Sequence, residues 1–214
     1  EKTYLMVGKK RAYSSNYYGW MLSIENDGGE IEVIFDVQEN HSGGGVSART
    51  TGSFGEWKYY VGVFEAGTSV KLYENGTLVS TNITEVPSSL TPNNDNFYIG
   101  IDEPNGAWGF KGNIDEVSMW DKALTAPEIT ALYNTGSGLD TSDNSGDYTS
   151  SSNLQSYYKF NTNEGNILYD HSGNQNHGTI YGAEWLENLI LGDINEDLAL
   201  NVQDIIIMID LILE

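Results

Sequence analysis

The chain has 214 residues, enough to bury a sizeable hydrophobic core, and its formal net charge is −21 at pH 7. Nucleic acid and anionic membrane surfaces would repel such an acidic chain, so neither is expected as a partner. Cysteine is absent, which excludes disulfides and thiol chemistry, and no apolar run reaches the roughly 18 residues of a membrane span. The 24 glycines and 14 tyrosines are typical of a mainly β chain with many turns.

The first part of the chain is predicted to form strands at residues 4–7, 19–25, 30–38 and 46–51, because glycine-rich turns separate these runs. Within the third run, apolar residues occupy every second position. Alternate residues of a strand point to opposite faces, so one face of this strand should belong to the core. The predicted core-facing residues are Ile31, Val33, Phe35 and Val37.

A hairpin is predicted next, because apolar and polar residues alternate from Val70 to Ser80. Asn75 and Gly76 lie between its two halves, and Asn-Gly is the strongest short-range signal for a two-residue hairpin turn. This pair fixes the register of the two strands.

A short helix of about three turns is predicted after Trp120. Thr125 can cap its first turn, Pro127 suits that turn, and Glu128 can complete a capping box. Gly136 is placed to end the helix. The residues predicted to share its buried face are Ile129, Leu132 and Tyr133.

Four motifs follow one another in a fixed order: WKYYVGVF, LYENGTLV, FYIG and GFKGNIDEVSMWDKALTAPEITALY. Together they resemble the laminin-G-like, concanavalin A-type jelly rolls of secreted bacterial proteins. The resemblance implies an antiparallel β-sandwich jelly roll with one short helix, formed by residues 1–136 without the opening strands of the family. It also implies a secreted or cell-surface protein.

Residues 137–153 are rich in Gly, Ser, Asp and Thr, which predicts a linker or a long loop. The next segment, within residues 154–188, resembles the opening strands of the same domain, as a partial repeat. Two pairings are open for these strands. They can complete the sandwich of their own chain, or they can pair with another chain by strand exchange.

Residues 189–214 resemble one half of a dockerin repeat, a calcium loop followed by a helix. The expected ligands of the ion (Ca²⁺) are Asp193, Asn195, Asp197, Ala199 through its carbonyl, Asn201 and Asp204. The dockerin pattern has Gly at the sixth loop position, where this chain has Leu198. Residues 205–213 are apolar except Asp210, so a helix there should dock on the sandwich or on a cohesin-like partner.

Two further places carry candidate calcium ligands. Asp170 and Asn174, with Ser172 and Asn176, bring oxygen ligands into one glycine-containing loop. A hydrogen-bonded Asx turn without metal is the alternative there. Asp115, at a patterned family position, is expected to bind calcium or a neighbouring turn, or else to cap the end of its strand.

Aromatic residues beside predicted turns are candidates for stacking on a sugar ring. They are Tyr17, Tyr18, Trp20 and Trp108. Trp57 and Trp120 are predicted to lie in the core instead.

The resemblance favours a non-catalytic module that binds carbohydrate on a cell surface, with calcium as a stabilising ion. A structural protein that assembles by strand exchange is one alternative. A glycoside hydrolase is another, although the acidic run with Glu30, Glu32 and Asp36 lacks the carboxylate spacing that some glycosidases of this fold use. The sequence therefore predicts no enzyme activity.

Overall fold

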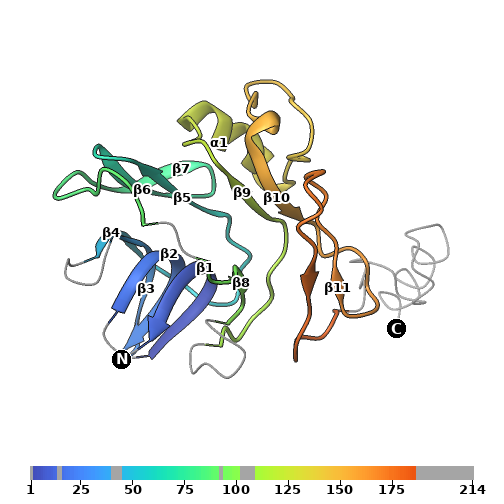
Figure 1. The fold of residues 1–214 in the computed structure, drawn as a ribbon, viewed down its shortest axis with the longest axis horizontal. Helices are drawn as coiled ribbons and strands as arrows, with labels where there is room; N and C mark the ends of the chain where they lie inside the picture. Colours follow the sequence, from blue (N-terminus) through green and yellow to red (C-terminus); the bar gives the residue numbers. More distant parts are fainter. Residues whose placement is uncertain (1, 14–15, 40–44, 92–93, 102–108, 187–214) are drawn as a thin grey trace, which may run out of the picture.

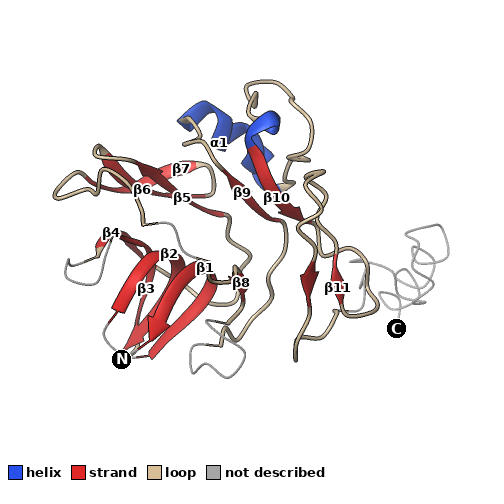
Figure 2. Ribbon diagram, in the orientation of Figure 1, coloured by secondary structure: helices blue, strands red, loops and turns tan. Residues whose placement is uncertain are grey.

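The structure is a computed structural model that describes residues 2–13, 16–39, 45–91, 94–101 and 109–186. The described part is mainly β (Figure 2). Its strands are β1 (Lys2–Tyr13), β2 (Asn16–Asp27), β3 (Glu30–Gln38), β4 (Val46–Thr51), β5 (Tyr60–Glu65), β6 (Ser69–Glu74), β7 (Thr77–Asn82), β8 (Tyr98–Ile99), β9 (Val117–Trp120), β10 (Leu154–Tyr158), β11 (Ile167–Leu168) and β12 (Gly178–Thr179). Its helices are α1 (Ala126–Tyr133) and the 3₁₀ turns η1 (Asn134–Gly136) and η2 (Ser151–Asn153).

The strands form antiparallel sheets in two principal layers (Figure 1). A five-stranded sheet has the order β4-β3-β2-β1-β8, and a three-stranded sheet has the order β5-β6-β7. β9 pairs with β10, and β11 pairs with β12. The predicted strands at 30–38 and 46–51 are confirmed with these bounds, whereas β1 and β2 extend well beyond residues 4–7 and 19–25.

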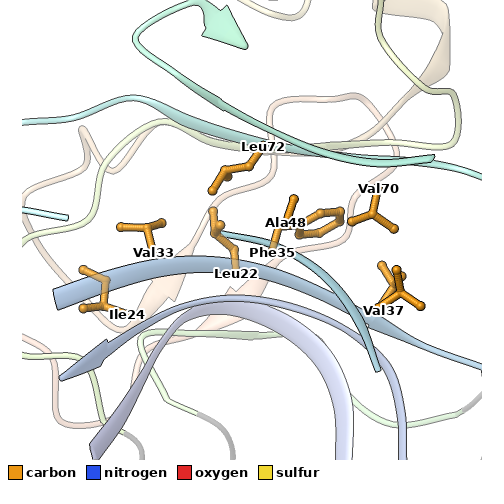
Figure 3. Close-up of a cluster of buried hydrophobic side chains, with 9 residues drawn as sticks. Leu22, Ile24, Val33, Phe35, Val37, Ala48, Val70 and Leu72 are labelled. Carbon is orange, nitrogen blue, oxygen red and sulfur yellow. The ribbon is translucent and has the colours of Figure 1, made fainter. Parts of the chain in front are cut away.

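The main core lies between the five-stranded and the three-stranded sheets. Val33, Phe35 and Val37 of β3 point toward Val70 and Leu72 of β6 (Figure 3). The prediction that the odd-numbered residues of β3 face the core is therefore confirmed, with Ile31 partly buried at its edge. Burial of these apolar side chains is the main force that joins the two sheets.

Gly62 of β5 lets the two sheets approach closely. A Cβ atom at this position would lie 2.3 Å from Cδ2 of Phe35, a separation that no side chain could tolerate without movement. The Phe35 ring thus occupies the space that a side chain on β5 would need.

The β6–β7 hairpin turns at the predicted Asn-Gly pair. Asn75 has φ 49° and Gly76 has φ 77°, both in the left-handed region that a type I′ turn requires. The backbone N–H of Asn75 donates to the Tyr59 carbonyl at 2.8 Å, which fastens the turn to the chain entering β5.

α1 begins as predicted and ends earlier. Thr125 and Glu128 form a reciprocal capping box, and Ile129 and Leu132 are buried. The helix ends at Tyr133 after eight residues, because Asn134 adopts a left-handed conformation before Gly136 is reached. Asn is the residue other than Gly that best tolerates this conformation, so the predicted length of three turns was too long.

Residues 137–153 form a long loop, one of the two alternatives that the composition leaves open. Tyr148 at its centre is fully buried, and its hydroxyl donates to the Thr141 carbonyl at 2.8 Å and accepts from Trp120 Nε1 at 2.9 Å. Tyr148, with Leu139 partly buried beside the same cluster, thus supplies the apolar surface that anchors the loop. Trp120 packs beside it against the helix core, as predicted.

The segment after this loop pairs with β9 of its own chain. β10 runs antiparallel to β9, with Leu154 opposite Trp120 and Tyr158 opposite Val117. Tyr158 and Leu168 are buried in a cluster with Val117. Residues 154–168 are therefore packed on the domain that precedes them.

Candidate functional site

The predicted aromatic platform is not assembled in the described part of the structure. Trp20 packs against the main core, with its ring centroid 5.8 Å from that of Phe97. Tyr18 lies two residues away on β2 and is half-buried. Trp108 and the side chain of Tyr17 lie outside what the structure describes. Core packing accounts for Trp20, and sugar binding by these residues stays a prediction.

Trp57 was predicted to lie in the core, but its side chain is exposed. Its side chain is 66% exposed in the segment before β5, together with Phe54 at 61%. The apolar alternation of WKYYVGVF suggests a strand from its first residue, but β5 begins only at Tyr60. Trp57 therefore precedes the part of the segment that faces the core.

Asp115 lies in the turn that leads into β9. Its Oδ1 accepts a hydrogen bond from the backbone N–H of Glu116 at 3.0 Å, and Glu116 has φ 52°. Partial burial raises the pKa of the Asp115 carboxyl. This contact fits the strand-capping role, one of the alternatives that the sequence leaves open for Asp115.

Asp170 forms the centre of a hydrogen-bonded loop. It is buried, and its Oδ1 accepts from the backbone N–H groups of Tyr157 and Ser172, both at 2.9 Å. Its Oδ2 accepts from the Ser172 hydroxyl and the Asn176 N–H, also at 2.9 Å. Burial alone would raise the pKa of Asp170, but these hydrogen bonds lower it.

The four donors to Asp170 affect whether this loop can bind calcium. A carboxylate offers about four lone-pair positions, and in Asp170 four protein donors already occupy them. The Asn174 amide donates to the Leu154 carbonyl at 2.8 Å. The geometry favours the Asx-turn alternative here. Among the described residues, no group of three or more His, Asp or Glu side chains is arranged to surround a metal ion.

The dockerin-like residues lie outside the described residues. These are Asp193, Asn195, Asp197, Ala199, Asn201 and Asp204. Calcium binding by this loop stays a prediction.

The acidic residues considered for hydrolysis, Glu30, Glu32 and Asp36, all lie on β3 of the five-stranded sheet. Glu25 of β2 is directly opposite Glu32 of β3, and Arg49 of β4 reaches both. Arg49 Nη1 lies 3.4 Å from Glu25 Oε2 and 3.2 Å from Glu32 Oε2. Like charges opposite each other on adjacent strands repel, and the shared guanidinium offsets that repulsion.

A second aromatic surface, which the sequence analysis did not identify, lies on β11 and β12. Ile167 is opposite Thr179 in the antiparallel register. Alternation therefore places Tyr169 and Tyr181 on the same side of the pair as these two residues, but beyond opposite ends of it. Ile167 and Tyr169 are each 44% exposed and Tyr181 is 78% exposed, whereas Leu168 and Ile180 pack in the core. We call Ile167, Tyr169, Thr179 and Tyr181 the outer face of β11–β12. The alternation in Ile167–Tyr169 and Thr179–Tyr181 was the signal that could have revealed it.

A hollow borders this face. It has a volume of about 260 Å³ and is lined by Thr162, Glu164, Gly165, Asn166, Ile167 and Tyr169. Its lining thus combines an aromatic ring and an aliphatic side chain with hydroxyl, amide and carboxylate groups.

Antiparallel sheets packed face to face, with one capped helix between β9 and β10, define a β-sandwich protein. Residues 3–130 match the family described as the Concanavalin A-like lectin/glucanases superfamily, and the chain belongs to that superfamily. This confirms the predicted fold class and the laminin-G-like part of the resemblance; the dockerin-like part lies outside the match.

Among solved structures, the chain is similar to an S-layer domain-containing protein from Clostridium thermocellum, with 23% sequence identity and a TM-score of 0.33. The similarity covers 59% of this chain and 63% of that chain. No curated protein matches the sequence. Within the described residues, no helix has the length and apolar character needed to cross a membrane.

Proposed function

We propose that this protein is a non-catalytic recognition module that binds carbohydrate at a cell surface. Membership of a superfamily described by its lectins and glucanases supports a function in binding or cleaving sugars. This inference rests on fold and family, so the choice between sugar binding and sugar cleavage must be argued from the residues of the site.

The contacts of Arg49 with Glu25 and Glu32 support binding rather than cleavage. Glycoside hydrolysis uses two carboxyl groups, one as acid and one as base or nucleophile, and the acid needs a raised pKa. Glu25 and Glu32 share one guanidinium, at 3.4 and 3.2 Å, so both carboxylates lie in the same charge-paired environment. A catalytic acid and its base need two different environments, since only the acid must have a raised pKa.

The pairing of β10 with β9 bears on the alternative of assembly by strand exchange. The strands that would be exchanged already pair within their own chain, along four register positions from Leu154 to Tyr158. The edge of β9 that an exchanged strand would fill is therefore occupied by β10 of the same chain.

Calcium belongs to the proposal as a stabilising ion of the C-terminal loop, residues 193–204. Its carboxylate and amide oxygens are the hard ligands that calcium prefers. A secreted or cell-surface location is proposed with it, because extracellular calcium would fill a weak site of this type.

A glycan array tests the function. The full chain is applied in calcium and again in chelator, and released sugar is assayed in the same wells. Binding without release is expected, and release that Glu32→Gln or Glu30→Gln abolishes would establish a hydrolase. A blank array, with a mass that rises with concentration, would favour the structural alternative.

A further inference from the structure

We propose that the outer face of β11–β12 is a binding site for a neutral oligosaccharide, with one sugar ring stacked on Tyr169 and another on Tyr181. The inference rests on the proposed function and assigns a site to it. The site lies outside the region matched by the superfamily, which ends at residue 130.

Exposure is the first reason. Tyr181 is 78% exposed and Tyr169 is 44% exposed, on a side of the β11–β12 pair whose opposite side packs in the core. An aromatic ring that is buried on neither face gains little for folding. Such a ring can cover the apolar C–H face of a pyranose, which removes apolar surface from water on both partners.

The neighbouring hollow provides the polar half of a sugar site. Thr162, Glu164 and Asn166 line it beside Ile167 and Tyr169. Ligand sites combine an apolar wall with a few polar groups that fix orientation, and sugar hydroxyls need both donors and acceptors. A volume of about 260 Å³ is below the roughly 300–1,000 Å³ of pockets for drug-sized ligands, so it suits about one sugar residue.

The face is also held in place before any ligand arrives. The Tyr169 ring lies edge-on to the His177 ring, with centroids 5.4 Å apart. The backbone N–H of Asp170 donates to His177 Nδ1 at 3.0 Å, and Trp185 Nε1 donates to the Gly165 carbonyl at 2.9 Å. A preorganised site loses less conformational entropy on binding, which favours affinity.

Charge selects a neutral ligand. Among the residues that form the face and the hollow, none is Lys or Arg, and Glu164 is acidic. The whole chain carries a net charge of −21. Sulfated sugars and uronic acids would be repelled, so the expected ligand is an uncharged glycan.

The test compares tyrosine variants of the full chain. Tyr169→Ala and Tyr181→Ala remove the rings, and Tyr169→Phe and Tyr181→Phe keep them. Trp57→Ala removes an exposed ring elsewhere, with an exposed fraction between those of the two tyrosines. Calorimetric titration with the neutral oligosaccharide that binds best on the array should show at least about tenfold weaker binding for each Ala variant. The Phe variants and Trp57→Ala should stay within about threefold of wild type.

Each other result overturns the proposal in a recognisable way. Unchanged binding in both Ala variants would reject this site and leave the proposed function intact. If the wild type binds no glycan, the proposed function and the site fail together. If a second copy of the chain occupies this face, sedimentation should show a dimer that Tyr181→Ala dissociates. If the chain's own C-terminal segment occupies it, glycan binding should appear only after residues 187–214 are removed. Because Tyr181 is largely exposed, Tyr181→Ala should fold even if Tyr169→Ala does not.

Discussion

Glu128 Oε1 accepts a hydrogen bond from the hydroxyl of Ser150, 22 residues further along the chain. The other oxygen of the same carboxylate accepts from the backbone N–H of Thr125 at 2.9 Å. Glu128 therefore caps α1 and also fixes the long loop 137–153 against it. Burial alone would raise the pKa of Glu128, but the hydrogen bonds from Ser150 and Thr125, with Lys122 nearby, lower it to about 2.

Glu128→Gln is expected to lower the free energy of unfolding at neutral pH. A pKa of about 2 in the folded state, against an ordinary 4.5, corresponds to about 3 kcal/mol. Because the folded-state pKa is depressed, this stabilisation is fully present above pH 4.5 and is lost as the pH falls toward 2. Urea unfolding at several pH values should show a fall in that window for the wild type and a flatter profile for Glu128→Gln.

Glu184→Gln is the control, since Glu184 is exposed. It should leave both the stability at neutral pH and the acid profile of the wild type unchanged. An acid profile of Glu128→Gln that still falls as steeply as that of the wild type would contradict the role assigned to this carboxylate.

Tyr148→Phe should destabilise the loop without creating a large cavity. The change removes the hydroxyl that links Trp120 Nε1 to the Thr141 carbonyl and leaves both groups without that partner. Buried polar groups that lose their partner cost about 1–3 kcal/mol each. Thermal unfolding should show a lower Tm than for Tyr181→Phe, in which an exposed hydroxyl is removed, and equal Tm values would contradict the role of Tyr148.

The sequence predicted the elements whose signals are local. Asn75-Gly76 specified a hairpin turn, and Thr125 with Glu128 specified a helix start, because both motifs act through backbone geometry within a few residues. The alternation in β3 was confirmed for the same reason. The end of α1 was misplaced because two residues, Asn134 and Gly136, can both adopt the left-handed conformation.

Features that depend on distant contacts were harder to predict. The composition of residues 137–153 gave no sign that Tyr148 would lie between Trp120 and Thr141. Trp57 was predicted to lie in the core, but β5 begins only at Tyr60, after it. The outer face of β11–β12 required the register of Ile167 with Thr179, which only the pairing of the two short strands reveals.

Asp170→Asn should weaken the attachment of loop 170–176 to β10. An amide nitrogen would replace one carboxylate oxygen and would then face donors such as the Asn176 N–H and the Ser172 hydroxyl. Hydrogen bonds to charged groups are worth about 1.5–3 kcal/mol, so a loss of about 2–4 kcal/mol is expected. Because protein donors already occupy the Asp170 carboxylate, Asp170→Asn should lower the free energy of unfolding in urea by the same amount in calcium and in chelator.

Asp147→Asn, at an exposed position, is the matched control and should leave the stability unchanged. If calcium stabilises the wild type but not Asp170→Asn, the ion binds at this loop and the Asx-turn alternative is wrong. A folded-state pKa below the ordinary value also predicts that the contribution of Asp170 declines as the pH falls below about 3.8.

Gly62→Ala should force the two main sheets apart. The new Cβ would lie 2.3 Å from Cδ2 of Phe35, and overpacking of this kind typically costs about 1–3 kcal/mol. Gly109→Ala is the control, because a Cβ there meets nothing within 4 Å. Phe35→Leu in the Gly62→Ala background should recover part of the loss, since the smaller side chain leaves room for the methyl group. Free energies of unfolding from urea titration of the wild type, Gly62→Ala, Phe35→Leu and the double variant would form a double-mutant cycle. Additive losses would mean that Gly62 and Phe35 do not compete for the same space.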